Sequence, residues 1–334
     1  MRRILLATTA IVALSAASPA FAFNLTLGGQ LGYNTAVSVQ HDHANSSEGA
    51  NVLLAGQAGL GNTIDNGVCV QRNSHPKPNC DWYEKPGQDA KGKGVNAAAI
   101  GQLGLGNYAK NRQKAEDKGV NLSGVGQIGI ANSAENYQNA KGKGSFNGSL
   151  VVQAGLLNEA TNDQKARDGK NNTATQWQLG AFNESSVSQD TSGGGGTKGN
   201  NDSDTVQVGF GNGSYVSQKG GNDQFTGQLG AGNISVTDQN HNQSSPNDST
   251  TLQAGLGNFS RTTQNGGNSD ATTVQGGVGN VSVTSQSDKN NTSQTFQAGA
   301  GNTAVVDQSG NGTNWSAVGQ VGAGNTFVSV QSSH

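Results

Sequence analysis

The sequence predicts an all-β protein: a β-solenoid with two strands per turn, about twelve repeats, and cross-β stacking between turns. Three observations lead to this fold class. A short pattern of glutamine, glycine and asparagine recurs along nearly the whole chain, residues inside each copy alternate with a period of two, and short glycine-rich links join the copies. A repeat that holds two strands and two turns is typical of a solenoid, in which each turn of chain stacks on the one before.

The first segment has the layout of a secretory signal peptide. Arg2 and Arg3 precede an apolar run over residues 4–17, and the small-residue site Ala20-Phe21-Ala22 follows. The alternative, a membrane anchor, needs about 20 apolar residues, and no later segment offers such a run. We therefore expect residues 1–22 to be removed and the mature chain, from Phe23, to be exported.

The composition is unlike that of an ordinary globular core. Only 32% of the 334 residues are hydrophobic, 51 are glycine, and the formal net charge is −2. Disorder usually combines low hydrophobicity with high net charge, whereas a nearly neutral chain rich in Asn, Gln, Gly, Ser and Thr can stack into β-structure through its amides. The 20 basic and 22 acidic residues nearly cancel, so the sequence predicts no nucleic-acid partner.

The repeat reads Q-x-G-x-x-N-x5-Q when the first glutamine is taken as its anchor. Two degenerate copies occupy residues 23–71: one has Gln30, Gly32, Asn34 and Gln40 with one residue missing, and the other closes late, at Gln71. An insertion over residues 72–95 follows, and residues 96–331 hold ten regular copies. The regular copies are anchored at Gln102, Gln127, Gln153, Gln178, Gln207, Gln228, Gln253, Gln275, Gln297 and Gln320.

Each repeat has two halves with the same layout. In the copy at 247–264 the halves read NDSTTLQ and NFSRTTQ, joined by AGLG. Period-2 alternation places Asn247, Ser249, Thr251 and Gln253 on one face of a strand. Small residues recur at the second position of this face, while the opposite face varies freely, so we expect the recurrent face to point inward. Asparagine leads the first half of every repeat except one, which has Ser269.

Stacking explains the choice of amides. With turns about 4.8 Å apart, each side-chain amide can donate to the same residue one turn away and accept from the other side, so a column of identical amides satisfies its members. We predict four such ladders, whose self-assembly residues are Asn96, Gln102, Asn107, Gln113, Gln127, Asn132, Gln138, Gln153, Asn158, Gln164, Gln178, Asn183, Gln189, Gln207, Asn212, Gln218, Gln228, Asn233, Gln239, Asn247, Gln253, Asn258, Gln264, Gln275, Asn280, Gln286, Gln297, Asn302, Gln308, Gln320, Asn325 and Gln331.

The connection between the halves, x-G-x-G, predicts a tight turn, because glycine adopts positive φ at no steric cost. The predicted turn glycines are Gly104, Gly129, Gly155, Gly180, Gly209, Gly230, Gly255, Gly277, Gly299 and Gly322.

Other residues give weaker indications. Cys69 and Cys80 lie close in an exported chain and predict one disulfide, so the 72–95 insertion is either a disulfide-tied excursion or a recognition loop. His41-Asp42-His43 is a weak metal candidate in a polar link. Because the sequence has no phosphate-binding loop, zinc constellation or catalytic triad, it predicts no enzyme, no cofactor and no metal site.

The repeat resembles that of curli subunits, bacterial secreted functional amyloids whose motif is similar to S-x5-Q-x-G-x-x-N-x5-Q. In one copy the match falls on Gln253, Gly255, Asn258 and Gln264, and Asn mostly replaces the family's leading Ser. The resemblance implies a subunit that polymerises with itself, with another curli-like subunit or nucleator and an outer-membrane secretion pore as partners, and roles in adhesion and biofilm matrix. FNLTLGGQ enters the first repeat at once, where curli subunits have a Gly- and Asn-rich leader.

Two further expectations concern assembly and its rivals. Few residues flank the first and last repeats, so the sequence predicts uncapped ends on which another copy docks. The degenerate first repeats are either a weak cap or a growth-limiting segment. The alternative function is that of a monomeric β-solenoid adhesin or ligand-binding surface protein. Varied outward residues such as Leu252 and Gly319 speak against ice binding, and Asn in place of Asp at the recurrent position speaks against a calcium-bound repeat.

Overall fold

The computed structural model describes residues 23–38, 40–42, 49–68, 85–86, 88–91, 93–191, 199–240, 245–310 and 312–333. Over these residues the chain forms strands and turns and contains no helix, and its strands build a parallel β-solenoid. The predicted fold class is confirmed. The chain divides into two compact units: unit 1 runs to Leu157 and includes Asn162–Gly169, and unit 2 comprises Asn158–Thr161 and the chain from Lys170.

In unit 1, one sheet holds the first half of each repeat and a second sheet holds the second half. The first-half strands are β1 (Phe23–Ser38), β3 (Ala50–Val68), β6 (Val95–Leu105), β8 (Val120–Ile130) and β10 (Phe146–Leu156), of which β1 and β3 continue past the corner into the second half. The other strands are β2 (Gln40–Asp42), β4 (Lys85–Pro86), β5 (Gln88–Lys91), β7 (Tyr108–Glu116), β9 (Ser133–Lys141) and β11 (Glu159–Arg167), which begins in the part grouped with unit 2.

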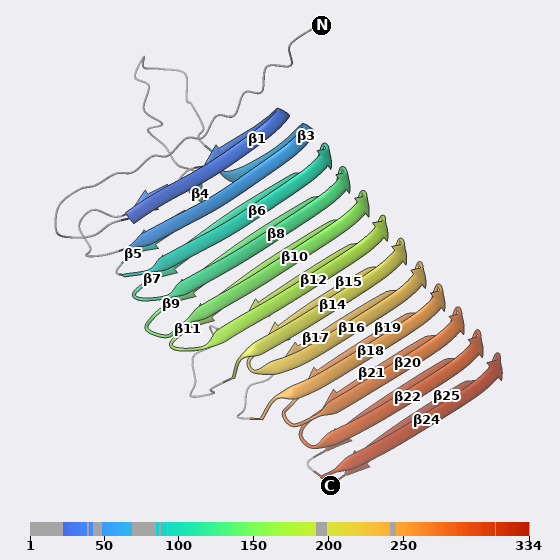
Figure 1. The fold of residues 1–334 in the computed structure, drawn as a ribbon. Coiled ribbons are helices and arrows are strands. Elements are labelled where there is room, and N and C mark those ends of the chain that lie inside the picture. Colours follow the sequence, from blue (N-terminus) through green and yellow to red (C-terminus); the bar gives the residue numbers. More distant parts are fainter. Residues whose placement is uncertain are drawn as a thin grey trace, which may run out of the picture. The chain divides into compact units, whose positions relative to one another are not determined.

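Unit 2 repeats the same arrangement (Figure 1). Counted in residues from one first-half strand to the next, its full solenoid turns are mostly shorter and more uniform than those of unit 1. Its first-half strands are β12 (Asn171–Ala181), β14 (Asn201–Phe210), β16 (Asn222–Ala231), β18 (Asn247–Leu256), β20 (Asp270–Val278), β22 (Asn291–Ala300) and β24 (Asn314–Ala323). Its second-half strands are β13 (Glu184–Asp190), β15 (Gly213–Lys219), β17 (Ile234–Asn240), β19 (Phe259–Asn265), β21 (Val281–Ser287), β23 (Thr303–Gly310) and β25 (Thr326–Ser333).

Successive turns pair in parallel and in register, so that each residue lies next to its counterpart in the neighbouring repeat. Gln228 pairs with Gln253, and Gln253 pairs with Gln275. The first repeat keeps this register across its missing residue, because the pairing of β1 with β3 shifts between Tyr33 and Thr35. A parallel, in-register stack brings identical side chains into columns along the solenoid.

The interior is built mainly from polar side chains. Inward positions alternate with outward ones along every regular strand, and the inward face predicted from the sequence is the buried one: Asn247, Ser249, Thr251 and Gln253 are each at most 3% exposed. Apolar core residues are few and small, so the largest fully buried side chains are mostly glutamines. Because a buried amide costs free energy unless it is hydrogen-bonded, the core is stable only if the amides of these columns bond to one another or to the backbone.

Candidate functional site: the amide ladders and corner glycines

The anchor glutamines form a continuous ladder within each unit. Gln253 donates one Nε2 hydrogen to Oε1 of Gln275 at 2.8 Å, and the same amide donates to the backbone carbonyl of Ile234 at 2.9 Å. Nε2 to Oε1 distances along the column run from 2.7 to 2.9 Å. The column contains Gln30, Gln57, Gln102, Gln127 and Gln153 in unit 1, and Gln178, Gln207, Gln228, Gln253, Gln275, Gln297 and Gln320 in unit 2.

The closing glutamines form a second ladder of the same kind. Gln239 donates to Oε1 of Gln264 at 2.8 Å, and the next bond, from Gln264 to Gln286, is also 2.8 Å long. The column contains Gln40, Gln88, Gln113, Gln138 and Gln164 in unit 1, and Gln189, Gln218, Gln239, Gln264, Gln286, Gln308 and Gln331 in unit 2.

One member of this column corrects the sequence analysis. Gln88, inside the predicted 72–95 insertion, holds the closing position of the second repeat: it accepts from Gln40 at 2.8 Å and donates to Gln113 at 2.7 Å. Gln71, to which we assigned that position, lies outside the described residues. The insertion therefore interrupts the second half of this repeat instead of following it. The segments QDAK at Gln88 and QNAK at Gln138 have the same layout, a signal that identifies Gln88.

The corner asparagines hold three layers of the stack together. Asn258 donates Nδ2–H to Oδ1 of Asn233 at 3.0 Å and to the carbonyl of Gly277, on the other side, at 3.1 Å. Its backbone N–H also donates to Asn233 Oδ1, at 3.2 Å. The column contains Asn34, Asn62, Asn107 and Asn132 in unit 1, and Asn158, Asn183, Asn212, Asn233, Asn258, Asn280, Asn302 and Asn325 in unit 2.

The leading asparagines form the fourth predicted ladder, with a break where Ser269 replaces asparagine. Asn96 in unit 1 and Asn247 in unit 2 each donate to the leading asparagine of the preceding turn, at 2.8 and 3.1 Å. At the break, only the backbone N–H of Ser269 reaches Asn247 Oδ1, and Asn291 donates instead to the carbonyl of Ser287. The serine keeps one bond of the column and loses the side-chain bonds on both sides.

The sequence analysis, which predicted four ladders, missed a fifth ladder in unit 1 at the third inward position. The second half of these repeats carries asparagine there, and Asn111 donates to Oδ1 of Asn66 at 3.0 Å. Asn162 in turn donates to Asn136 at 2.8 Å. All four side chains are fully buried. The signal in the sequence was the spacing N-x-A-x-N-x-Q, found at 107–113, 132–138 and 158–164.

The glutamine and asparagine ladders run in opposite directions. In the glutamine ladders the side-chain bond runs from each donor to the following turn, as from Gln253 to Gln275, whereas in the asparagine ladders it runs to the preceding turn, as from Asn258 to Asn233. Amides neither titrate nor act as strong nucleophiles near neutral pH, so what these columns offer chemically is hydrogen bonding of defined polarity. The two faces at the ends of such a stack therefore differ.

The two glycines of each corner have different constraints. Gly255 has φ of +124°, and a Cβ placed on it would lie 1.9 Å from the carbonyl oxygen of Gly277 in the next turn. Gly257 has φ of +63°, and a Cβ placed on it would meet nothing within 4 Å. The second site accepts other residues, since Ala131 and Phe182 adopt similar values there, +54° and +56°. All ten predicted turn glycines have positive φ: Gly104, Gly129, Gly155, Gly180, Gly209, Gly230, Gly255, Gly277, Gly299 and Gly322.

Among the described side chains, the charged ones of the strands occupy outward positions, and their arrangement differs between the units. In unit 2, Asp202, Asp223, Asp248 and Asp270 occupy the same outward position in four successive first-half strands. The pKa of Asp223 is raised by burial and then by the charges of Asp248 and Asp202, and the pKa of Asp248 is raised by burial and then by Asp270. This Asp column places like charges side by side on the sheet, an arrangement that is destabilising while they are ionised.

In unit 1 the charges lie on the second-half sheet. Glu116 pairs with Lys114 at 2.6 Å and with Lys141 at 3.2 Å, and the hydrogen bond from Lys114 is the main cause that lowers the pKa of Glu116. Lys110 pairs with Glu135 at 3.4 Å. The pairs of Lys141 with Glu116 and of Lys110 with Glu135 connect the neighbouring strands β9 and β7 along the outer face, whereas Lys114 and Glu116 pair within β7.

Several predicted features fall outside the described residues: the signal peptide over residues 1–22, the cysteines Cys69 and Cys80, and His43 together with the side chain of His41. Within the described residues, no three or more His, Cys, Asp or Glu side chains are grouped so as to hold a metal ion. The same part of the chain contains no helix with the length and apolarity needed to cross a membrane.

Comparisons with known proteins leave the ladders as the main guide to function. No protein-family model matches this chain, and a search of curated protein sequences found no significant match.

Proposed function

We propose that this protein is an exported, curli-like fibre subunit, whose copies join end to end on the cell surface and contribute to adhesion and biofilm matrix. The observation that carries the proposal is the opposite direction of the two kinds of ladder. It leaves the first and last described turns with hydrogen-bonding groups that complement each other, so that one copy can extend the ladders of another.

At the first described turn, glutamines offer acceptors and an asparagine offers a donor. Gln30 and Gln40 donate to the second turn, to Gln57 and Gln88 respectively. Among the described residues nothing donates to the Oε1 atoms of Gln30 and Gln40. Asn34 has one Nδ2 hydrogen bonded to the carbonyl of Leu31, which leaves its second hydrogen for a partner.

At the last described turn the polarity is reversed. Gln320 accepts from Gln297 and donates to the carbonyl of Thr303, so one of its two Nε2 hydrogens has no acceptor among the described residues. Asn325 donates to Asn302, and its own Oδ1 accepts no bond from the described part of the chain. If Gln320 of one copy faces Gln30 of another, and Asn325 faces Asn34, donors meet acceptors in both columns.

The packing at this turn supports the same proposal. Phe327, at an inward position, is 41% exposed, whereas the equivalent Ala304 one turn earlier is fully buried. A Cβ on Gly322 would meet only the Asn325 side chain, at 3.6 Å, while the same atom on Gly299 would lie 1.9 Å from Gly322. Head-to-tail contacts between two different faces generate open filaments, and unpaired strand edges are ready templates for them.

The test follows seeded fibre growth by residues 23–334 with an amyloid dye. We expect growth without a lag when preformed fibres are added, and a fibre-diffraction spacing of about 4.7 Å. Gln320→Glu keeps the acceptor for Gln297 but replaces Nε2, which donates to the Thr303 carbonyl and would donate to Gln30 Oε1 of the next copy, by a carboxylate oxygen. Seeded growth should therefore fall by about tenfold or more, the effect of roughly 1.4 kcal/mol.

Gln294→Glu is the matched control, because it makes the same charge change on an exposed, outward position of β22 and should grow at nearly the normal rate. A mature chain that stays monomeric in the presence of seeds would contradict the proposal. It would favour the alternative of a monomeric β-solenoid adhesin or ligand-binding surface protein.

A further inference from the structure

The outer surface of the first-half sheet of unit 1 carries no charged side chain in its described residues. On five adjacent strands, β1, β3, β6, β8 and β10, the outward positions over the central ten residues are apolar or glycine, with Tyr33 as the one residue bearing a hydroxyl. Many of these side chains are well exposed, including Leu31 at 53%, Leu103 at 52% and Ile128 at 57%. We call this surface the apolar face. It is larger than the apolar patches that monomers usually expose.

A column of glycines runs through the middle of the apolar face. Gly29, Gly56, Gly101 and Gly126 occupy the same outward position in four successive strands, one residue before the anchor glutamine. Their φ values are not positive, and a Cβ on any of them would meet nothing within 4 Å. Neither backbone conformation nor crowding inside the unit requires glycine here. Since glycine weakens strands and often marks the close approach of another molecule, a partner is the remaining reason for it.

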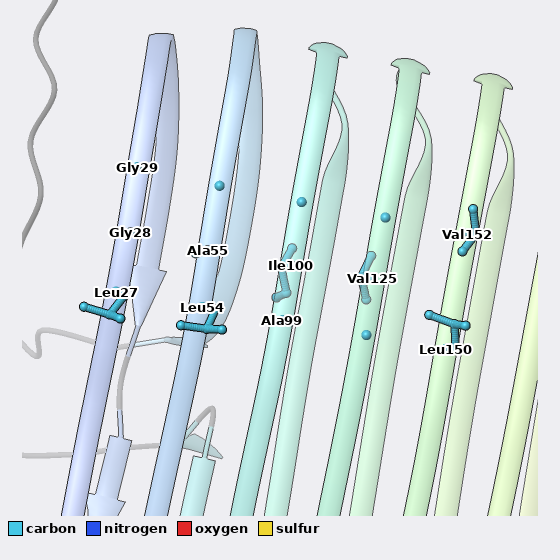
Figure 2. Close-up of a pocket in the computed structure, with 14 residues that line it drawn as sticks. Leu27, Gly28, Gly29, Leu54, Ala55, Ala99, Ile100, Val125, Leu150 and Val152 are labelled. Carbon is cyan, nitrogen blue, oxygen red and sulfur yellow. The ribbon is translucent and has the colours of Figure 1, made fainter.

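The glycines form the floor of a groove between two ridges. A groove of about 670 Å³ is lined on one side of the glycines by Leu27, Leu54 and Leu150, with the smaller Ala99 and Gly124 in the same column on β6 and β8. Figure 2 shows the three leucines standing on β1, β3 and β10. On the other side, two residues further along each strand, stand Leu31, Leu103 and Ile128, with smaller Ala58 and Ala154 in the same column. Ridge and groove are therefore parallel and about 6.6 Å apart.

We propose that two copies of this chain pair through the apolar face of unit 1. A ridge beside a parallel groove is self-complementary: a two-fold axis along the stacking direction, between the two columns, places the ridge of each copy over the groove of the other. Residues such as Ile128 and Leu103 then pack on the partner's glycines, twice in each pair. This is the isologous contact expected of a symmetric dimer, with sheets stacked face to face about 10 Å apart.

The size and charge of the face favour a second copy. Five strands at about 4.8 Å and nine residues at about 3.3 Å give an area of roughly 700 Å², close to the roughly 800 Å² per partner of a standard interface. The equivalent face of unit 2 carries the Asp column, including Asp223 and Asp248, so like charges oppose its pairing with itself. Between neighbouring strands, the backbone groups of the apolar face are already bonded within the sheet, so Tyr33 is the one side chain of the face with a polar group to desolvate on docking.

The experiment uses residues 23–334 carrying Gln320→Glu, so that end-to-end joining is weakened, and measures the dimer by sedimentation velocity over a range of concentrations. We expect a dimer at micromolar concentration. Gly101→Val fills the floor of the groove, so it should raise the dissociation constant of the dimer about tenfold or more. Valine is chosen because it favours strands and should leave the fold intact. Gly276→Val is the matched control, because it adds the same side chain to an open outer position of unit 2 and should dimerise normally.

A second variant, Leu103→Lys, places a charge on the ridge and should also weaken the dimer by about tenfold or more, while circular dichroism reports folding of every variant. Equal dimerisation of Gly101→Val and the parent chain, or a parent that stays monomeric, would overturn the proposal. A monomer that floats with phosphatidylcholine vesicles, and loses this binding in Leu103→Lys, would assign the face to lipid instead. Gly101→Val in the chain with native Gln320 should still show seeded growth, which separates this inference from the proposed fibre function.

Discussion

The two glycines of one corner offer a sharp test of the stacking geometry. Gly255→Ala and Gly257→Ala add the same methyl group two residues apart. At Gly255 the new Cβ would lie 1.9 Å from the carbonyl oxygen of Gly277, whereas an ordinary contact begins at about 3.4 Å, so the two turns must separate by about 1.5 Å at this point. At Gly257 the Cβ meets nothing within 4 Å.

The separation has a cost that can be worked from the contacts. It breaks the bond from Asn258 Nδ2 to the Gly277 carbonyl, and an unmade buried bond costs about 1–3 kcal/mol. The strained φ of +124° at residue 255 adds about 1–3 kcal/mol. We therefore expect Gly255→Ala to lose about 2–6 kcal/mol of unfolding free energy. For Gly257→Ala only the left-handed conformation counts, about 1 kcal/mol.

The assay is urea unfolding of the soluble chain followed by circular dichroism, with the slope m compared between variants to detect changes in the unfolded or folded state. Gly257→Ala is the control for the loss of a glycine as such, since Ala131 already occupies the equivalent corner position in unit 1. Equal losses for the two variants, within about 1 kcal/mol, would refute the idea that contact between turns at the first glycine sets its identity.

Three further predictions test the columns. Ser269→Asn should complete the leading-asparagine ladder and raise the free energy of unfolding by about 1 kcal/mol, and an unchanged urea midpoint would contradict this. Gln88→Ala should destabilise unit 1 by about 2–4 kcal/mol, because Gln40 and Gln113 lose their bonds to it; a loss no larger than that of an exposed Gln→Ala change would show that Gln88 is not part of the core. The folded-state pKa of Asp223 is raised above its ordinary value of 3.8, so its charge costs stability above the folded pKa, and that cost is relieved as the pH falls toward 3.8. Asp223→Asn should therefore raise the free energy of unfolding at pH 7 by a few tenths of a kcal/mol, and by less near pH 4. An equal gain at pH 7 and near pH 4 would exclude repulsion in the Asp column.

Sequence reasoning worked best where the repeat is regular. The anchor and closing glutamines and the corner asparagines lie in columns because the pattern fixes one side chain per turn. Parallel, in-register pairing then places these side chains next to each other. It was less successful where the pattern is broken. Gln88 was assigned to an insertion since the motif was counted forward from Gln57, whereas the solenoid closes each turn by position in space. The asparagines at 66, 111, 136 and 162 were missed because a pattern averaged over all repeats hides a ladder confined to one unit.

The apolar face shows a different limit. Outward residues were taken to vary freely, which holds along the chain as a whole, for example between Leu252 and Gly319. Within unit 1 the variation is restricted to apolar residues and glycine, a restriction that becomes visible once the five strands are placed side by side. A surface made of one residue from each of several repeats has no continuous segment in the sequence to mark it.

The split between one locked glycine and one permissive glycine in each corner also bears on how such a chain can change over generations. Substitutions at the inward amides are constrained by the turns on both sides, and those at the first corner glycine by the following turn. The second corner position and the outward positions are constrained by little inside the chain. Duplication of a repeat therefore copies a complete scaffold together with a free outer surface. One lineage of repeats can accumulate leucine and glycine while another accumulates aspartate, and both remain compatible with the same stack.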